Sequence, residues 1–263
     1  MGYDGQVRSR IYRPLDQRGP ARAPSLGLGA RLALGAGLAA LVSVPFVLLL
    51  LLVESQWEPL ERLDRSTANS LNSFGRSHSW LVHTGDVLEI ALDPMVFRIA
   101  VLAVAWWLWR REARRLAIWA VVTMAVGGIL GGVLKVLVER ARPVFPEPVA
   151  HSSGYSFPSG HALGSMLGVG VLILIFLPVL NRQGRVLAYL VGAVLVLLTG
   201  FDRVALGVHF VSDVVAGWVV ALAVLAGTSG AFEIWRREHG RPPSTVTEGV
   251  EPEAAPDISS DPT

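Results

Sequence analysis

The sequence predicts an all-α, polytopic membrane protein, a bundle of six transmembrane helices. Three observations support this fold class. Hydrophobic residues make up 52% of the 263-residue chain, charged residues make up only 17%, and the mean hydropathy is +0.48. The apolar residues fall into six runs, and most runs are close to the roughly 20 residues that a helix needs to cross a bilayer. Basic residues, nearly all of them arginines, gather in alternate connecting segments.

The first part of the chain is predicted to cross the membrane once and then lie along its surface. Residues 1–28 are basic and rich in proline and glycine, which predicts a disordered cytoplasmic segment. The apolar run at about 30–53 can span a bilayer and lacks the short apolar core and cleavage site of a signal peptide, so we expect an uncleaved helix. Residues 54–93 are mixed and polar with helical spacing, which predicts an extracytoplasmic interfacial segment.

Five further apolar runs complete the predicted bundle, and a polar tail follows it. The runs lie at about 92–109, 116–138, 161–180, 186–202 and 209–230. Together with the first run they form one membrane domain, which we expect to extend over residues 29–232. The tail, 233–263, is rich in proline, serine, threonine and acidic residues and has no apolar period from Arg236 onward. It is therefore predicted to be disordered and cytoplasmic.

The distribution of arginine predicts which side of the membrane each connection faces. Most arginines lie before the first run, at 110–115, at 182–185 and at 236–237. Because cytoplasmic connections carry the excess of basic residues, both termini are expected in the cytoplasm. The connections at 139–160 and 202–208 are then extracytoplasmic. The chain is thus predicted to be a multi-pass protein of the cell membrane whose polar motifs face outward.

Polar residues interrupt the apolar pattern in three places, all at the same side of the predicted bundle. Lys135 lies near the outer end of the third run, and Arg142 follows just beyond it. The stretch 158–161, Pro-Ser-Gly-His, opens the fourth run from that side. Ionisable residues at the ends of transmembrane helices are costly to bury, and we expect them to be functional. The connection between the fifth and sixth runs adds Arg203, His209 and Asp213.

The residue types in this set predict an anion site. Lys135 is the single lysine among 23 basic residues, and with Arg142 and Arg203 it has no matching carboxylate cluster in the sequence. Arginine forks pair with phosphate oxygens, and a lysine adds a compact charge. Ser159 and Gly160 fall at a predicted helix start, where free backbone N–H groups bind anions and glycine lets the backbone approach closely. We therefore expect a phosphate cradle.

Two histidines supply the predicted chemistry. His209 and Asp213 are four residues apart and share a helix face, so the carboxylate can fix the imidazole tautomer and leave the other nitrogen free to attack. His161 lies on another helix, where it is placed to protonate a leaving group. Such a pair suits in-line displacement at phosphorus. The chain has no cysteine and no carboxylate cluster for a metal ion, so we expect a reaction without metal or other cofactor.

The three motifs together resemble the signature of a known superfamily. The first is Lys135-x6-Arg142-Pro143, the second is Pro158-Ser159-Gly160-His161, and the third is Arg203-x5-His209-x3-Asp213. In order and spacing they are similar to the motifs of the type 2 phosphatidic acid phosphatase superfamily, which also contains vanadium haloperoxidases. The six-span plan is similar to its membrane-bound lipid phosphatase branch. The motifs cover about 135–213, and the resemblance of the helices extends over roughly 30–230.

The resemblance implies a fold, an activity and a role for each motif residue. Members of the superfamily share an all-helical core and hydrolyse phosphate esters through a phosphohistidine, without metal. Carried over by position, His209 is the implied nucleophile, Asp213 its partner and His161 the general acid. One position departs from the pattern, because Asp202 stands where many members have a serine, which bears on substrate preference. The implied phosphate-binding residues are Lys135, Arg142, Ser159, Gly160 and Arg203.

The sequence leaves several alternatives open. The substrate is either an isoprenoid carrier diphosphate, such as undecaprenyl pyrophosphate, or a glycerolipid, such as phosphatidic acid or phosphatidylglycerol phosphate. A vanadium-dependent haloperoxidase would use the same cradle, although six spans argue against it, and a non-enzymatic scaffold or transporter is a third alternative. Arg140 either pairs with Glu139 or binds a second phosphate, and His151 is either a loop residue or a substrate contact. The expected partners are a lipid phosphate and the bilayer, with no nucleic acid; the oligomeric state is open.

Overall fold

The computed structural model describes residues 43–259, and within this range the chain forms helices and loops without a β-strand. The all-helical fold class is thereby confirmed. The first helix, Ser43–Glu54, meets the next at an angle of 84°. The following elements are α2 (Glu58–Ser77), α3 (Ser79–Ala91), α4 (Pro94–Arg110), α5 (Arg114–Val138), α6 (Gly160–Phe176), α7 (Arg182–Ala205), α8 (Val211–Glu238), the 3₁₀ turns η1 (Val246–Glu248) and η2 (Pro252–Ala254), and α9 (Ala255–Ser259).

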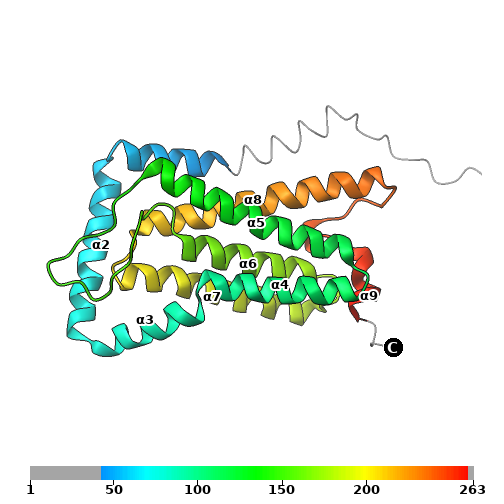
Figure 1. Ribbon diagram of the computed structural model, residues 1–263, viewed down its shortest axis with the longest axis horizontal. Coiled ribbons are helices and arrows are strands. Elements are labelled where there is room, and N and C mark those ends of the chain that lie inside the picture. Colours follow the sequence, from blue (N-terminus) through cyan, green and yellow to red (C-terminus); the bar gives the residue numbers. More distant parts are fainter. Residues whose placement is uncertain (1–42, 260–263) are drawn as a thin grey trace, which may run out of the picture.

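The helices α4 to α8 run side by side along the long axis of the molecule (Figure 1). α6 is the central helix, because it packs against α4, α5, α7 and α8. α2 lies across one end of this bundle, and α9 lies at the other (Figure 1). We call these the α2 end and the tail end. α5 and α7 run toward the α2 end, and α6 and α8 start there, so the loops that carry the polar motifs all lie at that end.

The membrane-spanning character of the chain is supported, although the number of spans stays a prediction. Within the described residues, α5, α7 and α8 are long and apolar enough to cross a membrane, with 25, 24 and 28 residues. The helix Ser43–Glu54 and α2 form a fourth candidate if the bent pair is one span. α4 and α6 have 17 residues each, which is short of the roughly 20 that a straight span needs. The six predicted spans are therefore not established.

Most predicted helix boundaries agree with the structure to within a few residues. The run 92–109 corresponds to α4, and the segment 54–93 forms α2 and α3. The run 161–180 is longer than α6, which ends at Phe176 because proline at position 178 cannot continue a helix. Residues 1–42 lie outside the described part of the chain, and with them the predicted cytoplasmic segment and much of the first run.

The C-terminal tail differs from the disorder that the sequence predicts. α8 continues to Glu238, past the predicted domain boundary at 232, and η1, η2 and α9 follow. Val250, Ala254 and Ile258 are buried in the same apolar cluster as the helices of the bundle. The sparse spacing of these apolar residues is not visible as a period in the sequence. Their burial against the tail end of the bundle stabilises the segment, so disorder is the wrong prediction for the described part of the tail.

One close helix contact fixes the geometry of the α2 end. A Cβ on Gly217 of α8 would lie 2.7 Å from the carbonyl oxygen of Ser159, so only glycine permits this approach. The backbone N–H of Ser159 donates to the carbonyl oxygen of Asp213 over 2.9 Å. The first turns of α6 and α8 are thus held against each other, which brings the second and third sequence motifs into contact.

Candidate active site

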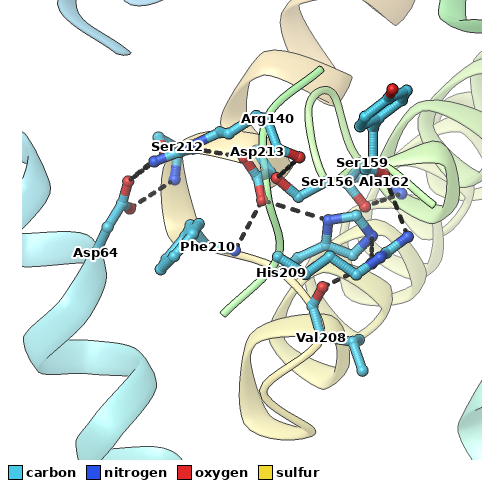
Figure 2. Close-up of polar contacts among 12 residues, drawn as sticks. Asp64, Arg140, Ser156, Ser159, Ala162, Val208, His209, Phe210, Ser212 and Asp213 are labelled. Carbon is cyan, nitrogen blue, oxygen red and sulfur yellow. Dashed lines mark hydrogen bonds and ion pairs between the residues drawn. The ribbon is translucent and has the colours of Figure 1, made fainter. Parts of the chain in front are cut away.

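The imidazole of His209 lies in the turn before α8, beside the carboxylate of Asp213 (Figure 2). Its Nδ1 is 3.4 Å from Oδ2 of Asp213, and both side chains are buried, with 3% and 0% exposed. On the other side of the ring, Nε2 lies 3.1 Å from Nη1 of Arg142. Because a guanidinium can only donate, Nε2 must accept, and Nδ1 must carry the proton that faces the carboxylate. The arrangement therefore assigns an unprotonated Nε2.

The charge state of His209 follows from its burial. Removal from water lowers the pKa of the imidazole below its ordinary value, and the nearby cations Arg142 and Lys135 act in the same direction. The hydrogen bond and the charge of Asp213 oppose this shift but do not reverse it. The ring is therefore neutral over a wider pH range than an exposed histidine, as a nucleophilic nitrogen requires.

The cations of the first motif bind backbone carbonyls of two loops, the one between α5 and α6 and the one between α7 and α8. Arg142 donates from Nη1 to the Val208 carbonyl over 2.6 Å and from Nε to the Gly154 carbonyl over 3.0 Å. Lys135, in the last turn of α5, donates from Nζ to the Tyr155 carbonyl over 2.7 Å. Burial lowers the pKa of Arg142, although a guanidinium stays charged at any physiological pH. Two positive groups thus lie beside Nε2 and are bound only to neutral oxygens in these contacts.

The second motif forms the start of α6. Ser159 is the N-cap, and its fully buried Oγ accepts from the backbone N–H of Ala162 over 3.5 Å. A Cβ placed on Gly160 would lie 3.9 Å from Cε of Lys135, so the helix start faces the first-motif lysine. His161 follows in the first turn, half-buried, with Nε2 3.7 Å from Oδ2 of Asp93. The free N–H groups of this helix start and the lysine form one positive region.

The guanidinium of Arg203 pairs with carboxylates, which the sequence did not predict. Its guanidinium is buried, with 2% exposed, and contacts Asp202 through Nε and Nη2 and Glu89 through Nη1, the last over 3.1 Å. The expectation that the three cations lack carboxylate partners is therefore wrong for Arg203. Glu89 lies on α3, in the segment that the sequence placed only at the membrane surface. Asp202, the residue that departs from the superfamily pattern, points at Arg203 and reduces its net charge.

Sequence reasoning named Arg140 but missed Asp64 and the contact of Arg140 with Asp213. Arg140 donates from Nη1 to Oδ1 of Asp213 over 2.5 Å and from Nη2 to Oδ2 of Asp64 over 2.9 Å (Figure 2). The predicted alternative, a pair with Glu139, does not form, because Glu139 instead accepts from the hydroxyl of Tyr155 over 2.9 Å. The signal that was available is the spacing of Arg140 two residues before Arg142, which places both on one side of an extended segment.

A cavity of about 650 Å³ adjoins this network. It lies between the helix Ser43–Glu54, α2 and the segment 138–145, and both Arg140 and Arg142 line it. Arg142 thus connects the cavity with the imidazole of His209. The other predicted loop residue, His151, is exposed in the segment between α5 and α6.

Comparisons with known proteins agree with the motifs. The model of the PAP2 superfamily matches residues 116–237, which contain every motif residue. Phosphatidylglycerophosphatase B of Bacillus subtilis is 37% identical over 112 residues, which cover 41% of this chain and 54% of that relative, so the match spans about half of its length. The bacitracin transport permease protein BcrC of Bacillus licheniformis is 30% identical over 171 residues, which cover 63% of this chain and 76% of the relative.

Two further matches concern a substrate class and the fold. An undecaprenyl-diphosphatase of Sulfolobus acidocaldarius is 26% identical over 155 residues, which cover 57% of this chain and 62% of the relative. The crystal structure of a transmembrane PAP2-type phosphatidylglycerolphosphate phosphatase from Bacillus subtilis superposes with a TM-score of 0.58. It is 23% identical and covers 76% of this chain and 98% of that chain, which supports the fold alone. Most of these relatives are named as phosphoric ester or anhydride hydrolases, and the chain belongs to the PAP2 superfamily.

Proposed function

We propose that the protein is a membrane-bound lipid phosphatase that hydrolyses a phosphate ester or diphosphate through a phosphohistidine on His209. The observation that carries this proposal is the unprotonated Nε2 of His209, which lies between the buried carboxylate of Asp213 and the guanidinium of Arg142. A nitrogen nucleophile with an oriented ring and an adjacent cation suits attack on a phosphoryl group.

The proposed reaction has two displacements at phosphorus. In the first, Nε2 of His209 attacks, the bond between phosphorus and the lipid oxygen breaks, and His161 transfers its proton to that oxygen. His161 lies at the start of α6, with its Nε2 3.7 Å from Oδ2 of Asp93. In the second, a water molecule gives its proton to His161 and its oxygen to phosphorus, and the bond to Nε2 breaks. Inorganic phosphate leaves, and both histidines return to their starting states.

Charge on the phosphoryl oxygens is proposed to be stabilised by groups of the chain itself. Lys135 and Arg142 bind carbonyl oxygens of residues 153–155, and phosphate oxygens would replace these weaker acceptors. The start of α6 at Ser159 and Gly160 adds backbone N–H groups. Arg203 contributes less charge, because Asp202 and Glu89 share it. The reaction is therefore proposed to need no metal ion.

The substrate is proposed to be a lipid phosphate of one of two classes. The name of the Bacillus subtilis relative supports phosphatidylglycerol phosphate, and the name of the Sulfolobus relative supports undecaprenyl diphosphate. The membrane-spanning helices support a substrate that reaches the site from the bilayer. Arg140 and Arg142 both line the 650 Å³ cavity, which offers space for a headgroup beside the reacting phosphate.

The activity is tested by phosphate release from purified protein in detergent. Phosphatidic acid, phosphatidylglycerol phosphate and undecaprenyl diphosphate are compared in EDTA, with and without orthovanadate. We expect release from at least one lipid that survives EDTA, is inhibited by vanadate and is absent in His209→Ala. Activity that is lost in EDTA and restored by a divalent metal would contradict the metal-free mechanism. Peroxide-dependent halogenation with vanadate, without phosphate release, would favour the haloperoxidase alternative.

The α2 end is proposed to face outside the cell, with both termini in the cytoplasm. The arginine distribution supports this orientation, because the tail end carries the cluster at 110–115. The chain has no cysteine, so single cysteines report the topology directly. Ser152→Cys, in the exposed loop of the α2 end, should react with a membrane-impermeant thiol reagent in intact cells. Arg114→Cys, exposed at the tail end, should not react, and the reverse labelling would overturn the orientation.

A further inference from the structure

A buried ionic network lies directly behind the His209–Asp213 pair, in residues outside the three motifs. Arg140 donates from Nη1 to Asp213 over 2.5 Å and to Oγ of Ser212 over 2.7 Å. Its Nη2 donates to Asp64 over 2.9 Å. Asp64 also accepts from the backbone N–H of Ser212 over 3.0 Å and from the Ser212 hydroxyl (Figure 2). One guanidinium thus joins two carboxylates from different helices.

The burial of these groups distinguishes the network from a surface ion pair. The side chains of Asp64 and Asp213 are 1% and 0% exposed, and that of Arg140 is 17% exposed. Burying several charges carries a large desolvation penalty, and apolar side chains could fill the same space without it. The face of the Phe210 ring lies 4.5 Å from the Arg140 guanidinium carbon and holds the fork in place from another side.

The two carboxylate oxygens of Asp213 have different hydrogen-bond partners. Oδ1 accepts from Arg140, whereas Oδ2 faces Nδ1 of His209 and accepts from the backbone N–H of Phe210 over 2.9 Å. Without Arg140, the carboxylate could rotate and lose its alignment with the imidazole. Arg140 also offsets part of the negative charge that His209 experiences, and Asp64 in turn offsets Arg140.

We propose that Asp64 and Arg140 are positioning residues that set the orientation of Asp213 and, through its charge, the basicity of His209. The chemical consequence rests on the function proposed above. The network carries one cation and two anions, so each partner shifts the imidazole in a definite direction. Removing the anion of Asp64 lowers the pKa of His209, and removing the cation of Arg140 raises it.

Other charged groups also face His209, and they stay constant in this comparison. They come from every helix that packs around the ring and from the loop before α6. They are Asp213 of α8, Lys135 of α5, Arg142 of the loop and His161 of α6, and Arg203 of α7 acts on His161. A purely structural role of the network, in attaching α2 to the bundle, would change stability in both variants but would not produce shifts of opposite sign.

The test is a direct titration of His209 in protein whose histidine rings are labelled with ¹⁵N. The chain has six histidines, and the resonances that are lost in His209→Gln are those of His209. Asp64→Asn should lower the pKa of His209 and Arg140→Gln should raise it, each by about half a pH unit or more. Glu58→Gln, an exposed carboxylate on the same helix, removes the same charge as Asp64→Asn and should leave the pKa unchanged.

A conservative variant separates charge from geometry. Arg140→Lys keeps the cation but loses the fork, so the pKa of His209 should stay near that of the unmodified protein. On a lipid phosphate, kcat of Arg140→Gln and Asp64→Asn should fall about tenfold or more and KM should change less than kcat, because neither residue contacts the reacting phosphate in the proposed mechanism. The acid limb of kcat/KM should move with the pKa of His209, because only the neutral ring attacks.

The outcomes are distinguishable from those of the proposed function, because the titration needs no activity. Unmoved resonances, or shifts of one sign in both variants, would overturn the positioning role even in an active enzyme. Opposite shifts in a protein that releases no phosphate would support the network and refute the phosphatase. If Asp64→Asn does not fold, the pair Arg140→Lys and Arg140→Gln, which differ by one charge, decides the question: equal titration in both would overturn the proposal.

Discussion

Two arginines, Arg140 and Arg236, lie at opposite ends of the bundle and have similar partners but different surroundings; their side chains are 17% and 1% exposed. Arg140 at the α2 end contacts two carboxylates, Asp64 and Asp213, and a serine hydroxyl. Arg236 at the tail end contacts the carboxylates Glu233 and Glu253 and the hydroxyl of Ser244, the last over 2.6 Å. The composition of the two centres is therefore nearly the same.

The two ion networks differ in the groups that they contact beyond the arginine. The Arg140 centre ends on a carboxylate that contacts the imidazole of His209, and it lines a cavity. The Arg236 centre joins the last turns of α8 to the tail, because Glu253 lies in η2. A buried ion network is thus no evidence of a catalytic role by itself. Its role depends on whether its carboxylates contact a reactive group, such as His209, or only another part of the fold. We expect changes at the α2 end to alter turnover and changes at the tail end to alter stability.

The largest expected effect is the loss of the nucleophile. His209→Ala should lower kcat by on the order of 10⁴-fold or more for every substrate, because no covalent intermediate can form. The matched control is His239→Ala at the tail end, where Nδ1 lies 2.9 Å from the Trp235 carbonyl. Phosphate release measured on purified variants of equal thermal stability should be close to that of the unmodified protein for His239→Ala. An equal loss in both would contradict the contrast between the ends.

The next effect separates the two histidines of the site. His161→Ala should lower kcat about 10²- to 10⁴-fold on a lipid phosphate, whose alkoxide leaving group needs a proton. With p-nitrophenyl phosphate, whose leaving group needs little protonation, the first step should stay much closer to its normal rate and appear as a burst of p-nitrophenol, although the later water attack still lacks its base. Rates on the two substrates are compared within each variant. If the activated ester rescues His209→Ala and not His161→Ala, the two roles are reversed.

A smaller effect is expected from the first-motif lysine. Lys135→Arg keeps the charge but replaces a compact ammonium with a planar fork, which does not fit the same contact with the Tyr155 carbonyl. A hydrogen bond to a charged group is worth about 1.5–3 kcal/mol, so kcat/KM should fall about tenfold to a hundredfold. Arg114→Lys, exposed at the tail end, is the control and should change nothing. Normal turnover in Lys135→Arg would mean that the residue supplies positive charge alone.

The smallest effect on turnover is expected at the Arg236 centre. Glu253→Gln leaves a buried guanidinium, 1% exposed, with one carboxylate instead of two, so the midpoint of thermal unfolding should fall by several degrees. kcat of the folded protein should stay within about twofold, because the tail end is remote from His209. Thermal unfolding and phosphate release are measured on the same samples. A large loss of kcat without a loss of stability would show that the two ends are coupled.

The sequence was sufficient for the helices and for the grouping of the motifs at one end of the bundle. Apolar runs predict helices because length and hydropathy are local properties, and α4 and α5 agree with them closely. The pairs Asp64–Arg140 and Glu89–Arg203 could not be predicted, because their partners lie on α2 and α3, far away in the chain. Amphipathic spacing predicts such helices but does not tell which of their carboxylates becomes buried.

The order of the C-terminal tail also depends on contacts with distant residues, which the local sequence does not predict. Its composition is typical of disorder, and only the packing of residues such as Val250 against the bundle makes it ordered. The departure at Asp202 was visible in the sequence, but its direction was not: the carboxylate binds Arg203 and reduces the charge available to a phosphate. Most features of the site that the motifs did not predict are therefore ion pairs between residues that are far apart in the chain.

The most direct test of the central claim is the capture of the covalent intermediate. The protein is mixed for milliseconds with a ³²P-labelled lipid phosphate, quenched in alkali, in which phosphohistidine is stable, and digested for peptide mapping. The account predicts label on His209 and no label in His209→Ala. Rapid phosphate release with no labelled histidine, or label on another residue, would contradict the mechanism.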